Sequence, residues 1–256
     1  MTQTDTSPLL IFADDGAPAS DRAWRWISSH PWPGWSVDVM TADESQIEWG
    51  APITPQPWTP PWERDRNSID AETVSFLTAG ADPRAMLAET TADLIVLGMK
   101  PARHLAAVMT GSTTEWLLHH PPSPLAIVKR SDPVSKVLVC ADGSPHSLRA
   151  IETFAALPLA GTTNVTVLSV DDGRVDPSSA GDAAGALESA VASVTTSTAS
   201  GRPTDAILAL ATDLSPDLIV LGTRGLTGWS RLRLGSTASA VVRSTSSDSL
   251  VACVNG

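Results

Sequence analysis

Short apolar runs alternate with longer mixed stretches along the chain, and the alternation is clearest in its second half. Four runs are mostly apolar: residues 137–141, 165–170, 218–221 and 250–254. Runs of this kind are typical of strands that are buried on both faces of a parallel sheet. Helix-like stretches separate them: residues 145–157, 178–190, 204–212 and 236–243. With residues 193–198 as a short edge strand, the pattern predicts a five-stranded, doubly wound α/β domain of parallel βαβ units.

The second half of the chain repeats the first. Three segments recur in the same order: 9–23 as 136–150, 93–98 as 217–222, and 111–113 as 235–237. The shared features include an Asp-Gly turn followed by Pro, the hexapeptide Asp-Leu-Ile-Val-Leu-Gly, and a Gly-Ser-Thr triplet. Because order and spacing are kept, we interpret the chain as a duplication. The expected domains are residues 1–132 and 133–256, and a Ser-Asp-Pro segment marks the join.

The first copy departs from this plan between its expected strands at residues 37–41 and 72–77. Segment 50–62 holds five prolines, which forbid a helix, so a Pro/Trp loop replaces the second helix. The helix before the fourth strand is expected to be shorter than its counterpart by about one turn. Trp58 and Trp62 would form either a recognition surface or a self-packed loop, and the self-packed loop is favoured. The first copy is therefore expected to be an eroded version of the second.

Composition and charge narrow the classes of function. Hydrophobic residues make up 42% of the chain and charged residues 18%, which is enough apolar material for a packed core. The formal net charge of −11 repels phosphate backbones and anionic lipid heads, so neither nucleic-acid nor membrane partners are expected. The polar N-terminus and the lack of a long apolar run favour a cytoplasmic protein. Cys140 and Cys253 lie in apolar runs and predict buried thiols, and the histidines show no metal-ligand spacing.

The strongest chemical signal follows the apolar run 218–221. Residues 222–237 read G-x2-G-x9-G-S-T, from the end of a strand to the start of a helix. Glycines let backbone N–H groups approach an anion, and a helix N-terminus adds free donors and the positive end of a dipole. Arg224, Arg231 and Arg233 make the stretch locally cationic on an acidic protein. The pattern indicates a phosphate site, although it is neither a Walker A loop nor a dinucleotide fingerprint.

This motif, with its preceding strand and an Asp-Gly-Ser turn after the first strand, resembles the universal stress protein family, and the duplication resembles its tandem members. The resemblance implies, in each copy, an adenine nucleotide alpha hydrolase-like sheet of order 3-2-1-4-5. The resemblance also implies that ATP, with or without Mg²⁺, binds at the carboxyl ends of strands one and four. Open α/β sheets in general bind ligands at this topological switch point.

The resemblance also assigns residues to the nucleotide. In the second copy they are Asp142 by the ribose and adenine, Val170 by the base, and Gly222, Gly225, Gly235 and Ser236 at the phosphates, with Arg224 and Thr237 in the same set. The matching positions of the first copy are Asp15, Ala42, Gly98, Gly111 and Ser112. There, Pro101 stands where the second glycine is expected, and proline removes an N–H donor and fixes φ. Lys100 would compensate partly as a point charge, so the first site is expected to be weakened or lost.

Plain structural roles compete with these assignments. Gly222 and Gly225 would serve as turn glycines, Asp142 would satisfy local N–H groups, and Ser236 would be an ordinary helix N-cap. Three functions are open: a non-catalytic ATP-binding regulator of a stress response, a weak ATPase or phosphotransferase, and an interaction protein with a vestigial site. The regulator is favoured because the glycine segment lacks a paired general base and a Walker lysine. At most slow ATP hydrolysis is expected.

The implied strand order also bears on assembly. In a sheet of order 3-2-1-4-5 the fifth strand is an edge, so residues 125–128 and 250–254 would leave unpaired backbone groups. Pairing the two edges within one chain would satisfy them. The resemblance further implies a homodimer of the tandem chain, and an unidentified protein partner stays open.

Overall fold

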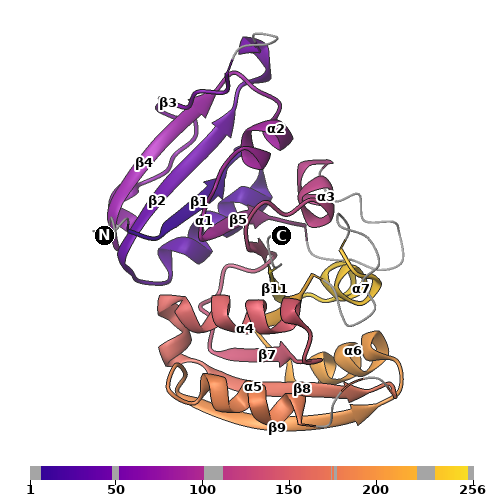
Figure 1. Ribbon diagram of the computed structural model, residues 1–256. Helices are drawn as coiled ribbons and strands as arrows, with labels where there is room; N and C mark the ends of the chain where they lie inside the picture. The colour runs from indigo at the N-terminus through magenta and orange to yellow at the C-terminus, as the bar shows by residue number, and fades with distance from the viewer. Residues whose placement is uncertain are drawn as a thin grey trace, which may run out of the picture.

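One continuous sheet of eleven strands forms the centre of the protein, in the order β3-β4-β2-β1-β5-β6-β11-β10-β7-β8-β9. The computed structural model describes residues 7–47, 52–100, 112–173, 175, 178–223 and 234–252. Figure 1 shows the two copies next to each other, the first above in indigo to magenta and the second below in rose to yellow. Each copy contributes five strands in the order 3-2-1-4-5, which confirms the predicted fold class.

The first copy carries the additional strand β3. Its strands are β1 (Leu9–Ala13), β2 (Trp32–Ala42), β3 (Gln56–Pro57), β4 (Ala71–Ala79), β5 (Leu94–Gly98) and β6 (Leu125–Val128). Its helices are α1 (Pro18–Ser28), α2 (Pro83–Ala88) and α3 (Ser112–His119), with the 3-10 turns η1 (Glu44–Gln46) and η2 (Arg66–Ser68). Strands β4, β2, β1, β5 and β6 run parallel in that order, and β3 pairs antiparallel with the outer strand β4.

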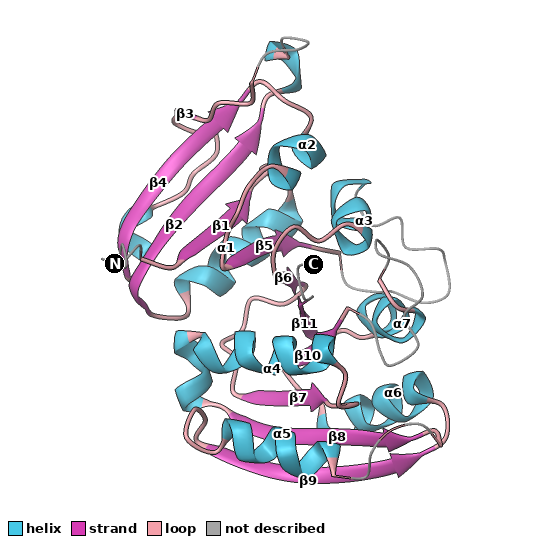
Figure 2. Cartoon of the chain, viewed as in Figure 1, coloured by secondary structure: helices cyan, strands magenta, loops and turns pink. Residues whose placement is uncertain are grey.

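The second copy follows the predicted alternation of strand and helix. Its strands are β7 (Lys136–Cys140), β8 (Asn164–Asp171), β9 (Ser193–Ser200), β10 (Leu218–Gly222) and β11 (Asp248–Ala252). Its helices are α4 (Pro145–Ala156), α5 (Ser179–Leu187), α6 (Pro203–Leu214) and α7 (Ser236–Ser244), with the 3-10 turn η3 (Pro158–Thr162). The core side chains of α4 and α5 belong to one face of the sheet, and those of α6 and α7 to the other (Figure 2).

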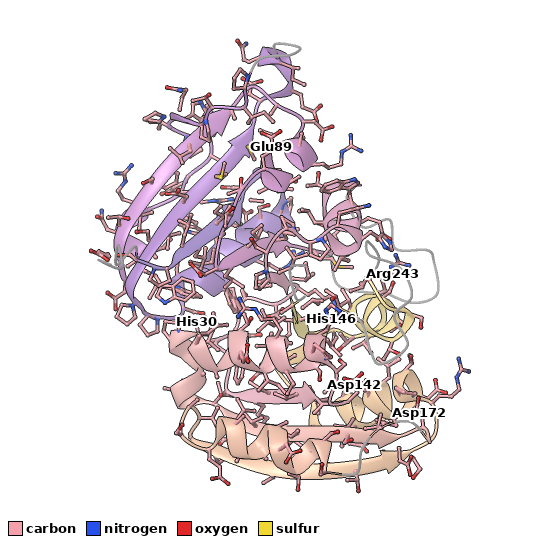
Figure 3. The ribbon with its side chains drawn as sticks, in the orientation of Figure 1. His30, Glu89, Asp142, His146, Asp172 and Arg243 are labelled. Carbon is pink, nitrogen blue, oxygen red and sulfur yellow. The ribbon has the colours of Figure 1, made fainter. Side chains whose placement is uncertain are left out.

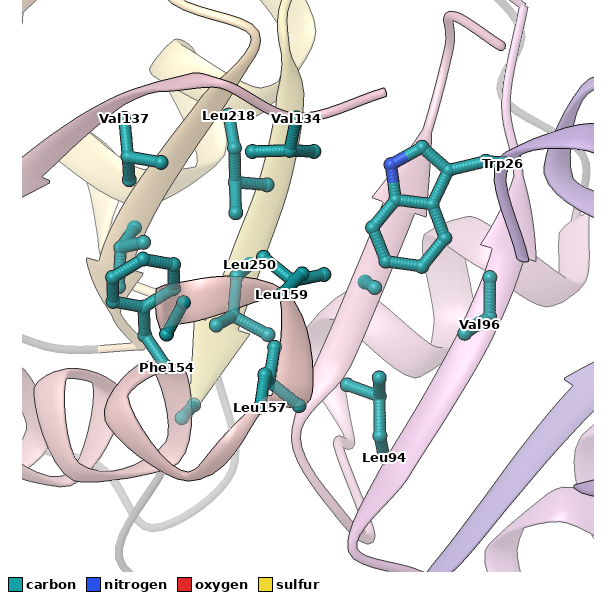
Figure 4. Packing of buried hydrophobic residues seen from close by; sticks show 14 of the residues in the cluster. Trp26, Leu94, Val96, Val134, Val137, Phe154, Leu157, Leu159, Leu218 and Leu250 are labelled. Atoms are coloured by element: carbon teal, nitrogen blue, oxygen red, sulfur yellow. The ribbon is translucent and has the colours of Figure 1, made fainter. Parts of the chain in front are cut away.

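The two copies meet at their fifth strands. β6 and β11 pair antiparallel, with Ala126 opposite Leu250, so each edge strand covers the other within the chain as predicted. Each face of the sheet carries a hydrophobic core that runs across both copies. Figure 4 shows Trp26 of α1 on the same side of the sheet as Leu157, Leu159 and Leu250 of the second copy. The two copies are therefore joined by a packed hydrophobic core.

The first copy differs most from the second between β2 and β4. The described part of this connection, residues 43–47 and 52–70, contains no α-helix, as its prolines predict. α2 has 6 residues against 12 in α6, a larger loss than the predicted single turn. Thr90 follows the end of α2 and donates its hydroxyl to the Met86 carbonyl at 2.8 Å. A β-branched residue in this place loses side-chain freedom in a helix, which favours an early end.

Candidate functional site

The candidate site of the second copy lies at the carboxyl end of β7, where the direction of the crossovers changes. β7 is hydrogen-bonded to β8 on one side and to β10 on the other. The chain leaves β7 through α4 on one face and enters β10 from α6 on the other face. This is the topological switch point at which open α/β sheets bind ligands. The described residues of the predicted site gather around it.

Asp142 occupies the turn that follows β7, and Figure 3 shows it beside the tip of that strand. Its Oδ1 accepts a hydrogen bond from the Ser144 N–H at 3.0 Å, which is the local structural role that competes with ligand binding. Gly143 has φ of +73°, a conformation that suits glycine. Ser144 then caps α4 by accepting from the Ser147 N–H at 3.2 Å. Local chemistry thus fixes Asp142 in place, with Oδ2 unengaged among the described residues.

The helix α7 begins close to the end of β10. The Gly235 N–H donates to the Thr223 carbonyl at 2.6 Å, so the described parts of the chain before and after segment 224–233 come together here. Gly235 is the N-cap of α7 and provides no capping side chain, and Ser236 and Thr237 form the first turn. Ser236 is therefore inside the helix and is not its N-cap. The first N–H groups of a helix have no partner within the helix, so this terminus offers free donors beside the switch point.

Gly222 has a packing role of its own. A Cβ built on this residue would lie 2.7 Å from the backbone carbonyl carbon of His146 and from the nitrogen of Ser147, at the start of α4. Gly98 of the first copy is equally constrained, since its Cβ would lie 2.3 Å from the Ala19 carbonyl oxygen. Close approach of a helix thus requires glycine at the end of the fourth strand in both copies, whatever binds nearby.

The remaining predicted residues of the second copy divide into two groups. Val170 lies near the end of β8 and is 6% exposed, so it forms part of the apolar wall beside the switch point. Arg224 and Gly225 lie outside the described residues. The structure thus brings together Asp142, the end of β8, the end of β10 and the start of α7.

The first copy has a cavity of about 490 Å³ at the corresponding place. Asp15, Ala42 and Gly98 line it, together with Thr113 and Thr114 of α3. Gly111 lies outside the described residues, and Ser112 is the first residue of α3 although its side chain is not described. Asp15 is engaged locally, because its Oδ1 accepts from the Ala17 N–H at 2.9 Å and the Ser20 hydroxyl at 2.6 Å.

The Pro/Trp segment closes one side of this cavity, which the sequence did not predict. The Trp58 and Trp62 rings pack edge to face, with their ring centroids 5.6 Å apart, as in a self-packed loop. Both rings also line the cavity. The Trp62 Nε1–H donates to Asp14 Oδ2 at 2.8 Å. Arg64 forms two further hydrogen bonds to the same carboxylate, at 2.9 and 3.0 Å, and an ion pair with Asp21. The segment is therefore bound to the turn after β1.

Arg64 and Asp14 are the site residues that the sequence reasoning missed. The side chain of Asp14 is 0% exposed and that of Arg64 is 5% exposed, so the pair is buried. Burial alone would lower the pKa of Arg64, but hydrogen bonds and charge attraction from Asp14 and Asp21 outweigh it and raise the pKa. One sequence signal was available, because Asp14 stands where the second copy has Ala141. An extra carboxylate at a buried position requires a cationic partner.

Two kinds of feature are absent from the described residues. No three His, Cys, Asp or Glu side chains in this part of the chain gather as a metal site would require. Among the described helices, none is both long enough and apolar enough to span a membrane.

Comparisons with known proteins agree with the fold. The universal stress protein family matches residues 65–129 and 133–252. Universal stress protein Slr1230 from Synechocystis is 26% identical over 159 residues, which is 60% of this chain and 55% of that protein. The chain thus spans about half the length of this curated relative.

Two solved structures extend the comparison. A universal stress protein from Archaeoglobus fulgidus matches with a TM-score of 0.66 and 18% identity, over 98% of this chain and 99% of the other. A universal stress protein in complex with cAMP is 25% identical over 48% of this chain and 98% of its own, with a TM-score of 0.40. Because the family matches most of the sequence in two successive segments, this chain belongs to the universal stress protein family.

Proposed function

We propose that this protein binds ATP through its second copy and acts as a non-catalytic nucleotide sensor in a stress response. The observation that carries the proposal is the start of α7, whose N-cap Gly235 has no side chain and which begins beside the switch point of β7, β8 and β10. Helix N-termini with glycine at the cap bind phosphate through free N–H groups and the helix dipole. In this proposal the N–H groups of Ser236 and Thr237 hold the phosphates, and Gly235, whose own N–H is bonded to the Thr223 carbonyl, leaves room for them to approach.

Two further residues fit the same ligand. The free Oδ2 of Asp142 is an acceptor for ribose hydroxyls or the adenine amino group, and Val170 offers an apolar contact for the base. Arg224 would add positive charge at the phosphates. Gly222 is assigned to helix packing, so its substitution is not a test of binding.

The sensor role follows from linkage between binding and stability. A ligand that binds only the folded state stabilises it by RT ln(1 + [L]/Kd), or about 2.7 kcal/mol when the ligand is in hundredfold excess over Kd. Other components of the cell would recognise the ATP-bound state of the protein. We place the protein in the cytoplasm as a homodimer, which light scattering at high concentration tests, and a strict monomer would contradict the dimer.

Calorimetric titration with ATP, ADP, AMP and cAMP tests the binding site. Gly235 has φ of −60° and ψ of 153°, which any residue adopts, so Gly235→Val places a side chain at the phosphate position without backbone strain. We expect one site for ATP in the wild type and at least a tenfold loss of affinity in Gly235→Val. Asp15→Ala, a change at the corresponding site of the first copy, should leave that affinity unchanged. Assay of ADP in the same mixtures separates binding from hydrolysis.

An equal affinity for ATP in Gly235→Val and wild type, with both variants folded by circular dichroism, would remove the proposed site. Rapid formation of ADP would replace the sensor with an enzyme.

A further inference from the structure

We propose that the cavity of the first copy is a second ligand site, and that it takes a planar aromatic ligand without phosphate, neutral or positively charged. The proposal is independent of ATP binding by the second copy. The cavity, of about 490 Å³, lies within the usual range of small-molecule sites. Its floor is apolar and includes Met40, Met86 and Leu97. A ring system of drug size would therefore find both room and apolar contacts there.

The charge of the described lining residues disfavours phosphate in this cavity. No lysine or arginine is among the described residues that line it, whereas Asp15, Asp43 and Glu44 do line it. The fourth lining carboxylate, Asp14, is neutralised by Arg64. Arg84 offsets part of the charge of Glu44, but a phosphate would still meet a net negative charge at short range, and the same charge attracts a cation. The first copy thus has the opposite electrostatic preference to the glycine segment of the second.

The aromatic wall favours a planar ligand. The Trp58 and Trp62 rings meet at an interplanar angle of 72°, so together they form a corner. Trp62 is held by its hydrogen bond to Asp14 and by packing on Gly16, where a Cβ would lie 2.7 Å from the indole. A tryptophan that is fixed in this way provides a stacking or cation–π surface at low entropic cost.

Two polar atoms are available to orient the ligand. Thr78 lines the cavity, and its buried hydroxyl Oγ1 has no hydrogen-bond partner within the described part of the protein. A buried polar atom without a partner is costly, so a ligand group that reaches it recovers free energy. Asp15 uses only Oδ1 for its two local hydrogen bonds, which leaves Oδ2 as an acceptor for an ammonium or N–H group.

The test uses two matched pairs of probes that differ in charge: tryptamine against indole-3-acetate, and adenosine against AMP. The readout is the indole N–H signals of Trp58 and Trp62 in nitrogen-15 NMR spectra, assigned from Trp58→Phe and Trp62→Phe. All spectra are recorded on the Gly235→Val variant, so that nucleotide binding in the second copy cannot contribute. We expect tryptamine or adenosine to shift these signals with at least tenfold higher affinity than its anionic partner.

Two variants supply the controls. Ala42→Leu extends a lining side chain into the cavity and should abolish the shifts, while melting experiments check that the variant folds. Glu44→Gln removes an exposed charge at the cavity. It should lower the affinity for tryptamine several-fold more than the affinity for adenosine. The proposal is overturned if no probe shifts either signal up to its solubility limit, if the anionic probes bind as well as their partners, or if folded Ala42→Leu binds unchanged.

Discussion

At the residue scale, the two copies differ by one carboxylate in the turn after their first strand. The first copy has Asp14 and Asp15 where the second has Ala141 and Asp142. The extra carboxylate is fully buried and binds Arg64 and Trp62 of the Pro/Trp segment. A single position thus determines which wall covers the first cavity.

The Asp14–Arg64 pair gives the first prediction. Arg64→Met leaves a buried carboxylate without its cation, so we expect the free energy of unfolding to fall by about 3–5 kcal/mol. The double variant Asp14→Ala/Arg64→Met, which copies Ala141 of the second copy, should regain most of this loss. Urea denaturation measures both changes.

Arg66→Met is the matched control for this pair. Arg66 lies two residues further along the chain and is exposed. Its guanidinium carbon lies 5.2 Å from the centroid of the Phe76 ring. Its substitution should cost no more than about 1 kcal/mol. If Arg64→Met is no more destabilising than Arg66→Met, Asp14 and Arg64 do not anchor the segment.

At the element scale, α7 has contacts from both copies. Its N-terminus is the proposed phosphate site of the second copy. At its C-terminus, the first-copy residue Lys129 donates its buried ammonium to the carbonyls of Val242 and Thr245, at 2.5 and 3.0 Å. A cation at this end of a helix complements the dipole. Burial lowers the pKa of Lys129 to about 8 despite the attraction of Asp248.

The lowered pKa gives the second prediction. Because the folded pKa is below the ordinary value of about 10.5, the folded state binds fewer protons than the unfolded state between pH 8 and 10.5. The stability contribution of Lys129 should therefore rise with pH in this window, with a slope of at most about 1.4 kcal/mol per pH unit. Few groups interfere, since the chain has three lysines and no tyrosine.

Urea denaturation from pH 7.5 to 9.5 tests this slope in a Cys140→Ala background. The background is needed because burial raises the pKa of Cys140 to about 12, which lowers stability as pH rises above about 9. Lys129→Met should remove the rise of stability with pH. The same slope in Lys129→Met would show that another group is responsible.

Several elements could be predicted from the sequence, and the reasons are physical. β5 and β10 carry the same run, Leu-Ile-Val-Leu-Gly, and are buried on both faces, so their apolar pattern is unambiguous. α4 begins at Pro145, as the expected helix 145–157 does, because the N-cap Ser144 and the first-turn Pro145 act locally. The short length of α2 and the role of Gly235 as N-cap of α7 were missed, because helix ends depend on small local differences.

The resemblance placed Asp15, Ala42 and Gly98 of the first copy at one site, and all three line its cavity, but the wall that closes this cavity could not be predicted. Its walls come from positions as distant as Asp14, Trp62 and Thr113, which only the folded chain brings together. The prolines predicted that the segment would not be helical, but not that it would pack on the turn after β1. A buried ion pair between residues 50 positions apart leaves no periodic pattern in a sequence.

At the scale of the whole molecule, the copies are joined by β6 and β11, by shared cores and by a buried histidine. His30 of the first copy uses both ring nitrogens: Nδ1 donates to the Trp26 carbonyl at 2.7 Å, and Nε2 accepts from the Val134 N–H at 2.9 Å. Only the neutral ring can act in this way. Burial lowers the pKa of His30 below its ordinary value of about 6.5, against the effect of the Trp26 carbonyl.

This histidine gives the third prediction. The folded state resists protonation of His30, so the unfolded state binds more protons below about pH 6.5 and stability falls as the pH falls through that window. His30→Gln should remove this part of the acid destabilisation. Unfolding free energies at a series of values between pH 5 and 7.5 measure the difference between the two proteins, so that contributions from other groups cancel. If the unfolding free energies of wild type and His30→Gln change with pH in the same way, His30 does not change its protonation on unfolding.

We propose that the two copies of one fold carry sites of opposite electrostatic preference, and that only the second binds ATP. Native mass spectrometry of the intact chain with millimolar ATP tests this most directly, because it counts bound nucleotides. We predict one ATP per chain in the wild type and in Asp15→Ala, and none in Gly235→Val. Two ATP molecules per chain, retention of ATP by Gly235→Val, or no bound ATP in the wild type would contradict the account.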